Sequence, residues 1–399
     1  MIDLRRARAE PDAVRAALAR KGAADLFDKL LEADVRWREV GARRDEVRAA
    51  QRRLGKPTPE QVEEAKRLKA ELKQLDDALA QSETERQEVW DRVPNPPDPS
   101  APDGFEEEDA VEVRRVGEPR EFSFEPRDHL DVAGGAIDME RGARVSGSRF
   151  AYRTGQAALL ELALYRFALD RLATKGFVPV LPPVLVRAPA MYGTGFLPTD
   201  EVNIYRIERD ELYLTGTSEV ALAALHMEEI LDELPRRYAG FSTCFRREAG
   251  AAGKDTRGMF RVHQFDKVEM FSFTRPEDSA AEHERLLAIE EELVQELGLP
   301  YRVVNVAAGE LGASATKKYD IEAWFPGQQR YREITSTSNT TDYQSRRLQI
   351  RYRTEGGPEL VHTLNGTAIT ARALIAILEN FQEEDGSVSV PSVLKDFGA

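Results

Sequence analysis

The sequence is poor in cysteine: Cys244 is the single thiol among 399 residues. One thiol excludes an internal disulfide, and it also excludes a structural zinc site built from several thiolates. We therefore expect a small buried side chain at Cys244, with neither zinc nor a disulfide framework.

Long apolar segments are also missing. The chain has no run of about eighteen apolar residues, so we expect no membrane-spanning helix and no membrane partner. Its first residues, MIDLRRARAEPDAVRAALARKG, are charged throughout and lack the apolar stretch of a secretory signal. These two features together favour a cytoplasmic location.

Two common nucleotide-binding motifs are absent as well. The sequence contains no GxxxxGK[ST] loop and no GxGxxG segment between a predicted strand and a predicted helix. These motifs mark P-loop and Rossmann sites, in which main-chain amides hold phosphates. If the chain binds a nucleotide, the surface of a sheet must provide the site.

A global excess of positive charge is lacking too. The formal net charge is -14, from 70 acidic residues against 56 Lys and Arg. Nucleic-acid phosphates are bound by Lys and Arg, so the overall charge argues against such a partner. A nucleic-acid interface would therefore need a local basic patch.

Two segments near the amino terminus repeat apolar or seam positions at alternating steps of four and three. In the first segment these positions are Leu26, Leu30, Ala33, Trp37, Val40, Arg44, Val47, Gln51 and Leu54. In the second they are Ala65, Leu68, Leu72, Leu75, Leu79, Ser82, Arg86, Val89 and Val93. Such heptads are typical of coiled coils. The turn GKPTPE between them predicts an antiparallel hairpin of two helices, each of roughly thirty residues and about 45 Å long.

The distal part of this hairpin has more cations than acidic residues, whereas the proximal part is acidic. The cations that we expect to contact RNA are Arg43, Arg44, Arg48, Arg52, Arg53, Lys66, Lys69 and Lys73. On the pattern alone, a solvated coiled-coil face or a dimerisation hairpin is the more common explanation. The RNA interpretation therefore depends on the chemistry of the remaining chain.

The composition changes after Trp90. The stretch VPNPPDPSAPDGFEEED is rich in proline and acid and reads as a linker. Beyond Arg120, amphipathic helices alternate with short β-branched and aromatic runs, which predicts an α/β or α+β body. The expected domains are residues 1–93, with the hairpin over about 25–93, a linker over 94–120 and a catalytic domain over 121–399.

Prolines interrupt one apolar run of this body, GFVPVLPPVLVR. Proline cannot donate to a β-ladder, so the run suits an edge or interface strand better than a central one. We interpret Pro183 in this setting as a sign of a dimer contact.

The segment FSTCFRREAGAAGKDTRGMFRVHQFDKVEMFSF predicts two strands joined by a flexible loop of Gly, Ala and Lys. Alternate residues of a strand share a face. Arg246 and Glu248 should therefore point together, as should the set Arg261, His263, Phe265, Lys267 and Glu269. Such a face could bind a triphosphate through arginines and stack a base on Phe265.

Two further segments add groups of the same kind. Glu333 and Ser336 in YREITSTSN offer a carboxylate and a hydroxyl, oxygen ligands that suit Mg²⁺. The segment TLNGTAITARALIAILEN contributes Arg372.

These residues resemble the three motifs of class II aminoacyl-tRNA synthetases, and more closely those of bacterial-type seryl-tRNA synthetases. GFVPVLPPVLV resembles motif one, FRREAG through FRVHQFDKVE motif two, and NGTAITARALIAILEN motif three. Flanking strings such as MYGTGFLP, LYLTGTSEV and LGASATKKYDIEAW look like the same family. The resemblance covers nearly the whole chain. It implies an α+β fold, with an antiparallel-sheet catalytic domain and an amino-terminal coiled-coil arm.

The resemblance also implies roles for individual residues. Arg246, Glu248 and Arg372 would be catalytic, and the serine pocket would comprise Thr217, Ser218, Glu219, Arg246, Glu269, Asn365 and Thr367. ATP would be bound by Arg246, Arg247, Glu248, Val262, Phe265, Glu333, Ile334, Thr335, Ser336 and Arg372. Glu333 and Ser336 would hold Mg²⁺.

The implied reaction joins L-serine to ATP as seryl-adenylate and then transfers serine to the 3′ end of tRNA(Ser), or of tRNA(Sec) where one exists. The family is homodimeric and uses the arm to contact tRNA. Three alternatives remain: a duplicate synthetase serving self-resistance or a biosynthetic pathway, an amino acid:carrier protein ligase, and a non-catalytic paralogue.

Overall fold

The computed structural model describes residues 1–250, 253, 255 and 257–398. These residues form two compact units, Met1–Pro96 and Pro97–Ala399, and each unit has a hydrophobic core of its own. No helix in the described part of the chain is long and apolar enough to cross a lipid bilayer.

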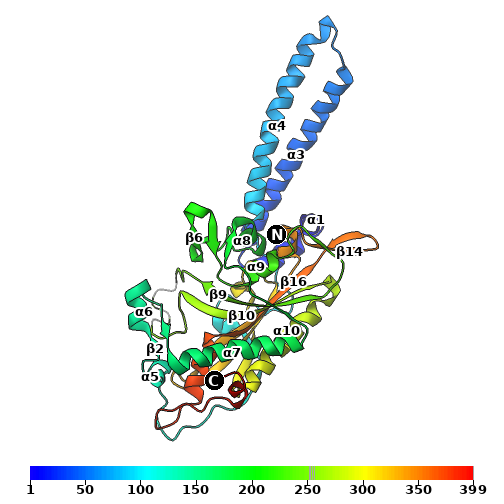
Figure 1. Cartoon of the computed structure of the whole chain (residues 1–399). Coiled ribbons are helices and arrows are strands. Elements are labelled where there is room, and N and C mark those ends of the chain that lie inside the picture. Colours follow the sequence, from blue (N-terminus) through cyan, green and yellow to red (C-terminus); the bar gives the residue numbers. More distant parts are fainter. Residues whose placement is uncertain (251–252, 254, 256, 399) are drawn as a thin grey trace. The chain divides into compact units, whose positions relative to one another are not determined.

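The first unit contains the predicted hairpin. Helix α3 spans Ala24–Leu54 and helix α4 spans Val62–Trp90, and the two lie side by side in antiparallel orientation (Figure 1). Leu30, Val47 and Leu68, all predicted seam positions, are buried. Between the helices, Gly55 adopts a φ of 57° and Thr58 caps the turn Pro59–Gln61. The helical arm expected from the heptads is thus confirmed.

Two short helices, α1 (Leu4–Ala9) and α2 (Pro11–Ala19), pack on the proximal end of α3. Their small hydrophobic core includes Leu18, Phe27 and Val93. Burial of these side chains from separate segments fixes the base from which the two long helices extend.

The second unit is built on an eight-stranded sheet. In spatial order its strands are β1 (Val111–Val116), β11 (Tyr301–Asn305), β12 (Lys317–Phe325), β13 (Arg330–Thr341), β16 (His362–Thr370), β10 (Gln264–Thr274), β9 (Arg236–Phe245) and β4 (Val178–Val180). All neighbours are antiparallel except β4 and β9, which are parallel. The expected α+β class with an antiparallel sheet is confirmed.

Strand β1 lies within the segment 94–120 that the sequence predicts as a linker. It pairs with β11 from Val111 to Val116, and the amide of Asp98 already donates to the carbonyl of Thr316 at 2.8 Å. The sequence VEVRRV has the alternating valines of a strand, but its acidic surroundings conceal the signal. Much of the predicted linker therefore belongs to the second unit.

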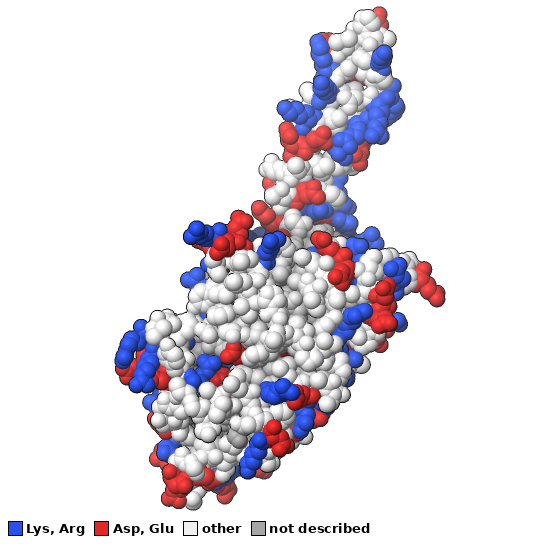
Figure 2. Space-filling model, viewed as in Figure 1, with Lys and Arg blue, Asp and Glu red and all other residues white. Residues whose placement is uncertain are grey.

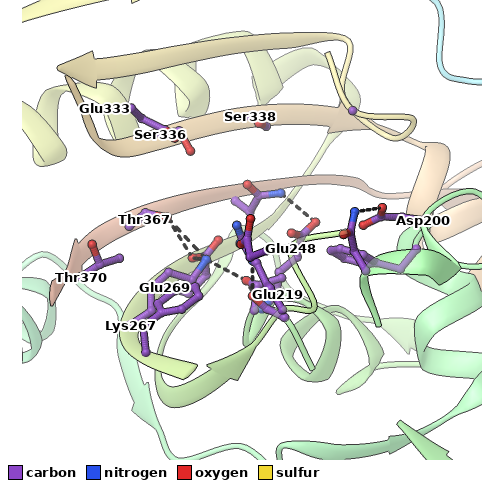
Figure 3. Close-up of a pocket in the computed structure, with 18 of the residues that line it drawn as sticks. Asp200, Glu219, Glu248, Lys267, Glu269, Glu333, Ser336, Ser338, Thr367 and Thr370 are labelled. Atoms are coloured by element: carbon purple, nitrogen blue, oxygen red, sulfur yellow. Dashed lines mark hydrogen bonds and ion pairs between the residues drawn. The ribbon is translucent and has the colours of Figure 1, made fainter. Parts of the chain in front are cut away.

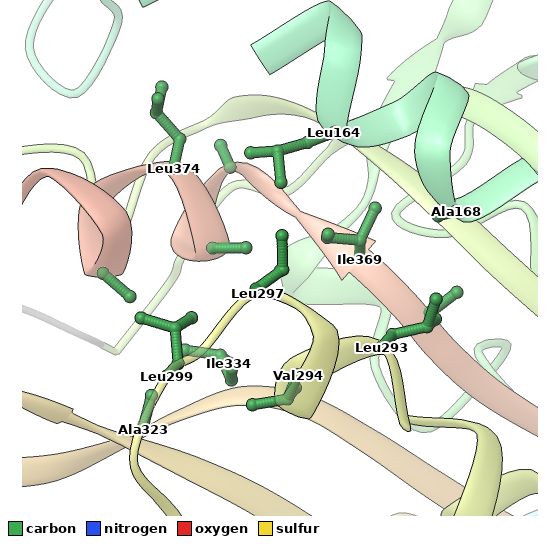
Figure 4. Close-up of a cluster of buried hydrophobic side chains, with 14 of the residues drawn as sticks. Leu164, Ala168, Leu293, Val294, Leu297, Leu299, Ala323, Ile334, Ile369 and Leu374 are labelled. Carbon is green, nitrogen blue, oxygen red and sulfur yellow. The ribbon is translucent and has the colours of Figure 1, made fainter. Parts of the chain in front are cut away.

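Three helices cover one face of the sheet: α7 (Gly155–Thr174), α10 (Ser279–Glu296) and α12 (Ala371–Asn380). Leu164 of α7, Leu293 of α10 and Leu374 of α12 meet sheet residues such as Ile334 and Ile369 in one core (Figure 4). Side chains on the opposite face of the central strands remain available for a site.

The proline-containing run forms β4 at the edge of the sheet, as its sequence predicts. Three smaller sheets complete the strands: β5 (Leu185–Arg187), β7 (Leu212–Leu214) and β6 (Tyr205–Ile207); β15 (Gly357–Leu360), β14 (Arg351–Thr354) and β8 (Ile230–Leu231); and the pair β2 (Ile137–Asp138) and β3 (Tyr152–Arg153). The remaining α-helices of this unit are α5 (His129–Ala133), α6 (Met139–Ser146), α8 (Ala188–Thr194), α9 (Glu219–Ala224), α11 (Tyr343–Leu348) and α13 (Ser392–Lys395).

Candidate active site

A cavity of about 770 Å³ opens over the sheet face that the helices leave uncovered. Its floor consists of alternate residues from three adjacent strands: Phe265, Lys267 and Glu269 of β10, Asn365 and Thr367 of β16, and Ser336 and Ser338 of β13 (Figure 3). The period of two along a strand explains why these side chains share one face.

Two β-bulges bring in residues that strict alternation would place on the opposite face. In the β12–β13 ladder Ile321 pairs with Thr335 but Glu322 pairs with Glu333, so Ile334 is an extra residue in β13 directly after Glu333. In the β10–β16 ladder an extra residue separates Thr367 from Thr370. Both Glu333 and Thr370 consequently line the cavity.

Nearly all the residues predicted for the serine and ATP sites line this one cavity. They are Thr217, Glu219, Arg246, Glu248, Val262, Phe265, Glu269, Glu333, Ile334, Thr335, Ser336, Asn365, Thr367 and Arg372. They come from segments as distant as residues 217 and 372, so the chain fold alone brings them together.

Two predicted residues do not line the cavity. Ser218 is buried, and its hydroxyl donates to the carbonyl of Gly240 at 3.3 Å. The amide of Arg247 donates to the carbonyl of Asn203 at 2.9 Å, and its guanidinium lies over the ring of Tyr205. Neighbours along the chain point in different directions here, so Ser218 and Arg247 do not share the cavity with Thr217 and Arg246.

The predicted strand pair is present as β9 and β10, but both strands are shorter than the sequence suggests. Strand β9 ends at Phe245 and β10 begins at Gln264, so Arg246, Glu248 and Arg261 lie outside the ladder. Glu248 has a φ of 51°, which is not an extended conformation. The alternation argument therefore fails for these residues, although all three line the cavity. The predicted flexible Gly, Ala and Lys loop includes residues 251, 252, 254 and 256, which lie outside the described residues.

Arginines surround one end of the cavity. Nε of Arg246 donates to the carbonyl of Gly216 at 3.0 Å, and its guanidinium lies 5.3 Å from the centroid of the Phe265 ring. Arg261 donates to Glu248 at 2.6 Å. Held at fixed positions, such guanidinium groups offer paired donors to phosphate or carboxylate oxygens.

A second charged group centres on Glu333. Nη1 of Arg372 donates to its carboxylate at 2.8 Å, and Nζ of Lys318 lies 3.7 Å from it. Burial alone would raise the pKa of Glu333, but Lys318 and Arg372 more than offset this effect, so the carboxylate stays ionised. Lys318 also pairs with Asp320 at 2.8 Å, and burial raises the pKa of Asp320.

The other end of the cavity is a compact polar cup. Lys267 forms an ion pair with Glu269 and donates to the hydroxyl of Thr217 at 2.8 Å. The hydroxyl of Thr367 donates to Glu269 at 3.4 Å. Glu269, Lys267 and Thr217 are all buried, so this cup offers fixed donors and acceptors to a small ligand.

Glu219, the first residue of α9, lies beside this cup. Its Oε1 accepts hydrogen bonds from Gln344 at 2.7 Å and from Asn365 at 2.8 Å. Burial raises the pKa of Glu219 to about 7, and the nearby charge of Glu269 adds to the shift. A carboxylate with such a pKa titrates near neutral pH, which is typical of functional sites.

Sequence reasoning gave no role to Lys318, Asp320 or Gln344. Lys318, Asp320 and Glu322 alternate along a strand of the sheet, and this period-two run of charges was an available signal. For Gln344 no signal existed, because its position depends on how α11 packs against β16.

The expected RNA-binding cations lie on the exposed or partly exposed surface of the hairpin, where Lys and Arg gather on its distal part (Figure 2). Some are engaged in ion pairs: Arg43 with Glu71 at 2.7 Å, Arg44 with Asp76 at 2.9 Å, and Lys66 with Glu63 at 2.7 Å. Arg52, Lys69 and Lys73 form no ion pair with any residue that the structure describes.

The antiparallel sheet, the arginines of motifs two and three and the carboxylate cup define a class II aminoacyl-tRNA synthetase. Residues 203–381 match the tRNA synthetase class II core domain (G, H, P, S and T), and residues 1–97 match the seryl-tRNA synthetase N-terminal domain. These matches, together with relatives that are 52% identical over the whole chain, show that the chain belongs to the seryl-tRNA synthetase family.

Individual relatives support this assignment over the full length. The serine--tRNA ligase of Acidothermus cellulolyticus is 52% identical over 411 residues, which cover 100% of this chain and 98% of the relative. That of Streptomyces coelicolor is 52% identical over 414 residues, covering 100% and 97%. The crystal structure of seryl-tRNA synthetase from Pyrococcus horikoshii complexed with ATP has a TM-score of 0.94 and 40% identity, covering 100% of this chain and 98% of that one.

Proposed function

We propose that the chain activates L-serine with ATP and transfers the serine to the 3′ end of tRNA(Ser). The observation that carries this proposal is one cavity with a buried carboxylate cup at one end and arginines at the other. The carrier protein ligase would leave the long amino-terminal arm without a partner, so it is the weaker candidate.

The carboxylate cup suits the amino acid. Glu219 and Glu269 can accept from an ammonium group, while Thr217 and Thr367 offer hydroxyls to a hydroxymethyl side chain. Alanine would leave these buried groups without a partner, and discrimination by roughly 10⁴-fold is the expected consequence. Threonine would have to be rejected by size.

The arginines suit the nucleotide. Arg246 lines the same cavity as the cup, and its guanidinium lies over the ring of Phe265. From this position it could bind both the serine carboxylate and the α-phosphate of ATP while the base stacks on the ring. The serine carboxylate attacks the α-phosphorus, the bond to the bridging oxygen breaks, and pyrophosphate leaves. Alignment and neutralisation of charge by Arg246 and Arg372 would supply the catalysis, without a protein nucleophile.

A Mg²⁺ ion fits the donors beside Arg372. The carboxylate of Glu333 and the hydroxyl of Ser336 both line the cavity, and oxygen donors with room for water are what Mg²⁺ prefers. When bound, the ion would neutralise charge on the ATP phosphates. Lys318 and Arg372, which contact Glu333, would share that neutralisation.

ATP–pyrophosphate exchange measured with each of the twenty amino acids tests this proposal. We expect exchange with serine alone, and we expect Arg246→Ala to abolish it. Arg149 lies outside the cavity, so Arg149→Ala serves as the control that should retain exchange. Exchange driven equally well by another amino acid, or normal exchange in Arg246→Ala, would reject the assignment.

Transfer to tRNA is proposed to depend on the hairpin of α3 and α4. Activation of an amino acid in the sheet cavity does not require a hairpin about 45 Å long. A long cationic hairpin can, however, contact the phosphates along a structured RNA. Because the interaction would be mainly with phosphates and sugars, tRNA shape rather than anticodon sequence would be recognised.

A homodimer is proposed from the surface next to the edge strand β4. Val178 is 56% exposed and Leu181 is 81% exposed, and Leu162 of α7 adds a third exposed apolar side chain at 58%. An edge strand flanked by exposed leucines is a surface that a second copy can cover. Analytical sedimentation of the wild type and of Leu181→Glu measures the oligomeric state. We expect the variant to shift toward monomer.

A further inference from the structure

We propose that Gln344 is a positioning residue for the amino-acid pocket: it holds Glu219 in the orientation in which its free oxygen accepts the substrate. This inference rests on the proposed serine activation. Gln344 does not line the cavity, so it would act only through Glu219.

The amide of Gln344 has a single possible orientation. The main-chain oxygen of Thr194, 3.5 Å from Nε2, can only accept, so it fixes the nitrogen on the side of Glu219, to which Nε2 donates at 2.7 Å. On the other side, Oε1 accepts a hydrogen bond from the hydroxyl of Thr363 at 2.9 Å. Thr363 is fixed in turn by Thr340, whose hydroxyl lies 2.6 Å from that of Thr363. A fully buried amide held at both ends has no freedom to rotate.

Two amides from different elements converge on the same carboxylate oxygen. Gln344 comes from α11 and Asn365 from β16, and both donate to Oε1 of Glu219, at 2.7 Å and 2.8 Å. No residue in the described part of the chain donates to Oε2. Saturating one oxygen in this way leaves the other for a ligand in the cavity.

The arrangement also affects when Glu219 is charged. Burial and the charge of Glu269 raise its pKa, while the hydrogen bond from Gln344 and the charges of Lys267 and Arg246 lower it. Gln344 belongs to α11, Lys267 and Glu269 belong to β10, and Arg246 follows β9. Asn365 faces Glu219 from β16. Loss of the Gln344 hydrogen bond should therefore raise the pKa of Glu219 further, so that less carboxylate is present at neutral pH.

Gln344→Met, which keeps the length of the side chain but removes the amide, tests this role in ATP–pyrophosphate exchange between about pH 6 and 9. We expect the KM for serine to rise about tenfold at pH 7, with the KM for ATP changed less than about twofold. The pH below which serine binding weakens should move upward relative to the wild type. Gln382→Met is the matched control, because Gln382 is also fully buried and its amide donates to the main-chain oxygen of Arg127 at 2.8 Å, but it lies outside the cavity.

Thr363→Val is the second variant, for the case in which Gln344→Met fails to fold. Removing the hydroxyl that orients the amide should produce the same serine-selective change, at a smaller size. Equal changes in both KM values, or an unshifted pH profile, would overturn the positioning role. If the wild-type chain shows no serine-dependent exchange at all, the proposed function itself fails, which is a distinct result.

Discussion

Nη1 of Arg372 lies 2.8 Å from Oε2 of Glu333 and 3.0 Å from the main-chain oxygen of the same residue. Arg372 is at the start of α12, where the hydroxyl of Thr370 caps its amide at 3.1 Å. Glu333 reaches the cavity face only because of the bulge in β13. A helix start and a strand bulge thus fix the two charges relative to each other.

Arg372→Ala should strongly reduce ATP-dependent chemistry, since it removes a fixed cation from the phosphate end. We expect a fall in exchange of roughly 10²- to 10³-fold, carried mainly by kcat and the KM for ATP. Arg372→Lys should recover part of this loss, because a lysine keeps the charge without the paired geometry. Serine binding measured by calorimetry without ATP should be unaffected; a large loss there would show that the residue acts on the fold.

The pH dependence of serine binding should follow Glu219. Its pKa is raised from 4.5 to about 7, so the carboxylate form that accepts an ammonium is lost as the pH falls through about 7. The KM for serine should rise in that range while the KM for ATP stays flat. Glu219→Gln should give a high KM for serine that no longer varies between about pH 6 and 8. A wild-type KM for serine that is constant over this range would contradict the assignment.

Transfer to tRNA should depend on the distal cations of the arm. Replacing Arg52, Arg53, Lys69 and Lys73 by Ala should lower kcat/KM for tRNA by roughly tenfold or more, because several phosphate contacts are lost. The dependence of kcat/KM on salt concentration should become weaker for the same reason. Serine-dependent exchange, which needs no tRNA, should remain normal. The matched control replaces Asp77, Glu83, Glu85 and Glu88 of α4 by Ala. Equal losses of charging in both variants would argue against a specific role for the cations.

The sequence predicted the parts of this molecule whose pattern is periodic. Heptad spacing located the two helices of the arm, and alternation within β10 placed Phe265, Lys267 and Glu269 on one face. Strand alternation does not explain the position of Glu333, because the extra residue after it in β13 is a bulge that no sequence pattern reveals.

Residues outside regular strands were predicted through family motifs rather than through geometry. Arg246 and Glu248 line the cavity although they lie beyond the end of β9, whereas Arg247 between them points elsewhere. Gln344 could not be found because its contact with Glu219 joins α11 to α9, which lies more than a hundred residues earlier in the sequence.

Asp34 provides a prediction on the stability of the amino-terminal unit. It is 1% exposed on α3 and pairs with Arg8 at 2.7 Å, with Arg38 at 3.1 Å and with Arg86 at 3.5 Å. Asp34→Ala leaves the buried Arg86 without its carboxylate and should destabilise this unit by about 3 kcal/mol, because an uncompensated buried charge is costly. Hydrogen exchange of peptides from residues 24–54 measures the change in local unfolding.

The control for this change is Asp28→Ala, since Asp28 pairs with Arg15 at 2.9 Å on the surface, where both side chains are well exposed. Loss of this surface ion pair should lower the free energy of unfolding by no more than about 1 kcal/mol. The contribution of Asp34 should also depend on pH. Burial alone would raise its pKa, but Arg8 and Arg38 lower it below the usual 3.8, so the stabilisation is complete above that pH and is lost as the pH falls below it. A wild-type unit whose protection is unchanged in acid well below pH 3.8, or an Asp34→Ala variant no less stable than Asp28→Ala, would show that the three arginines do not depend on this carboxylate.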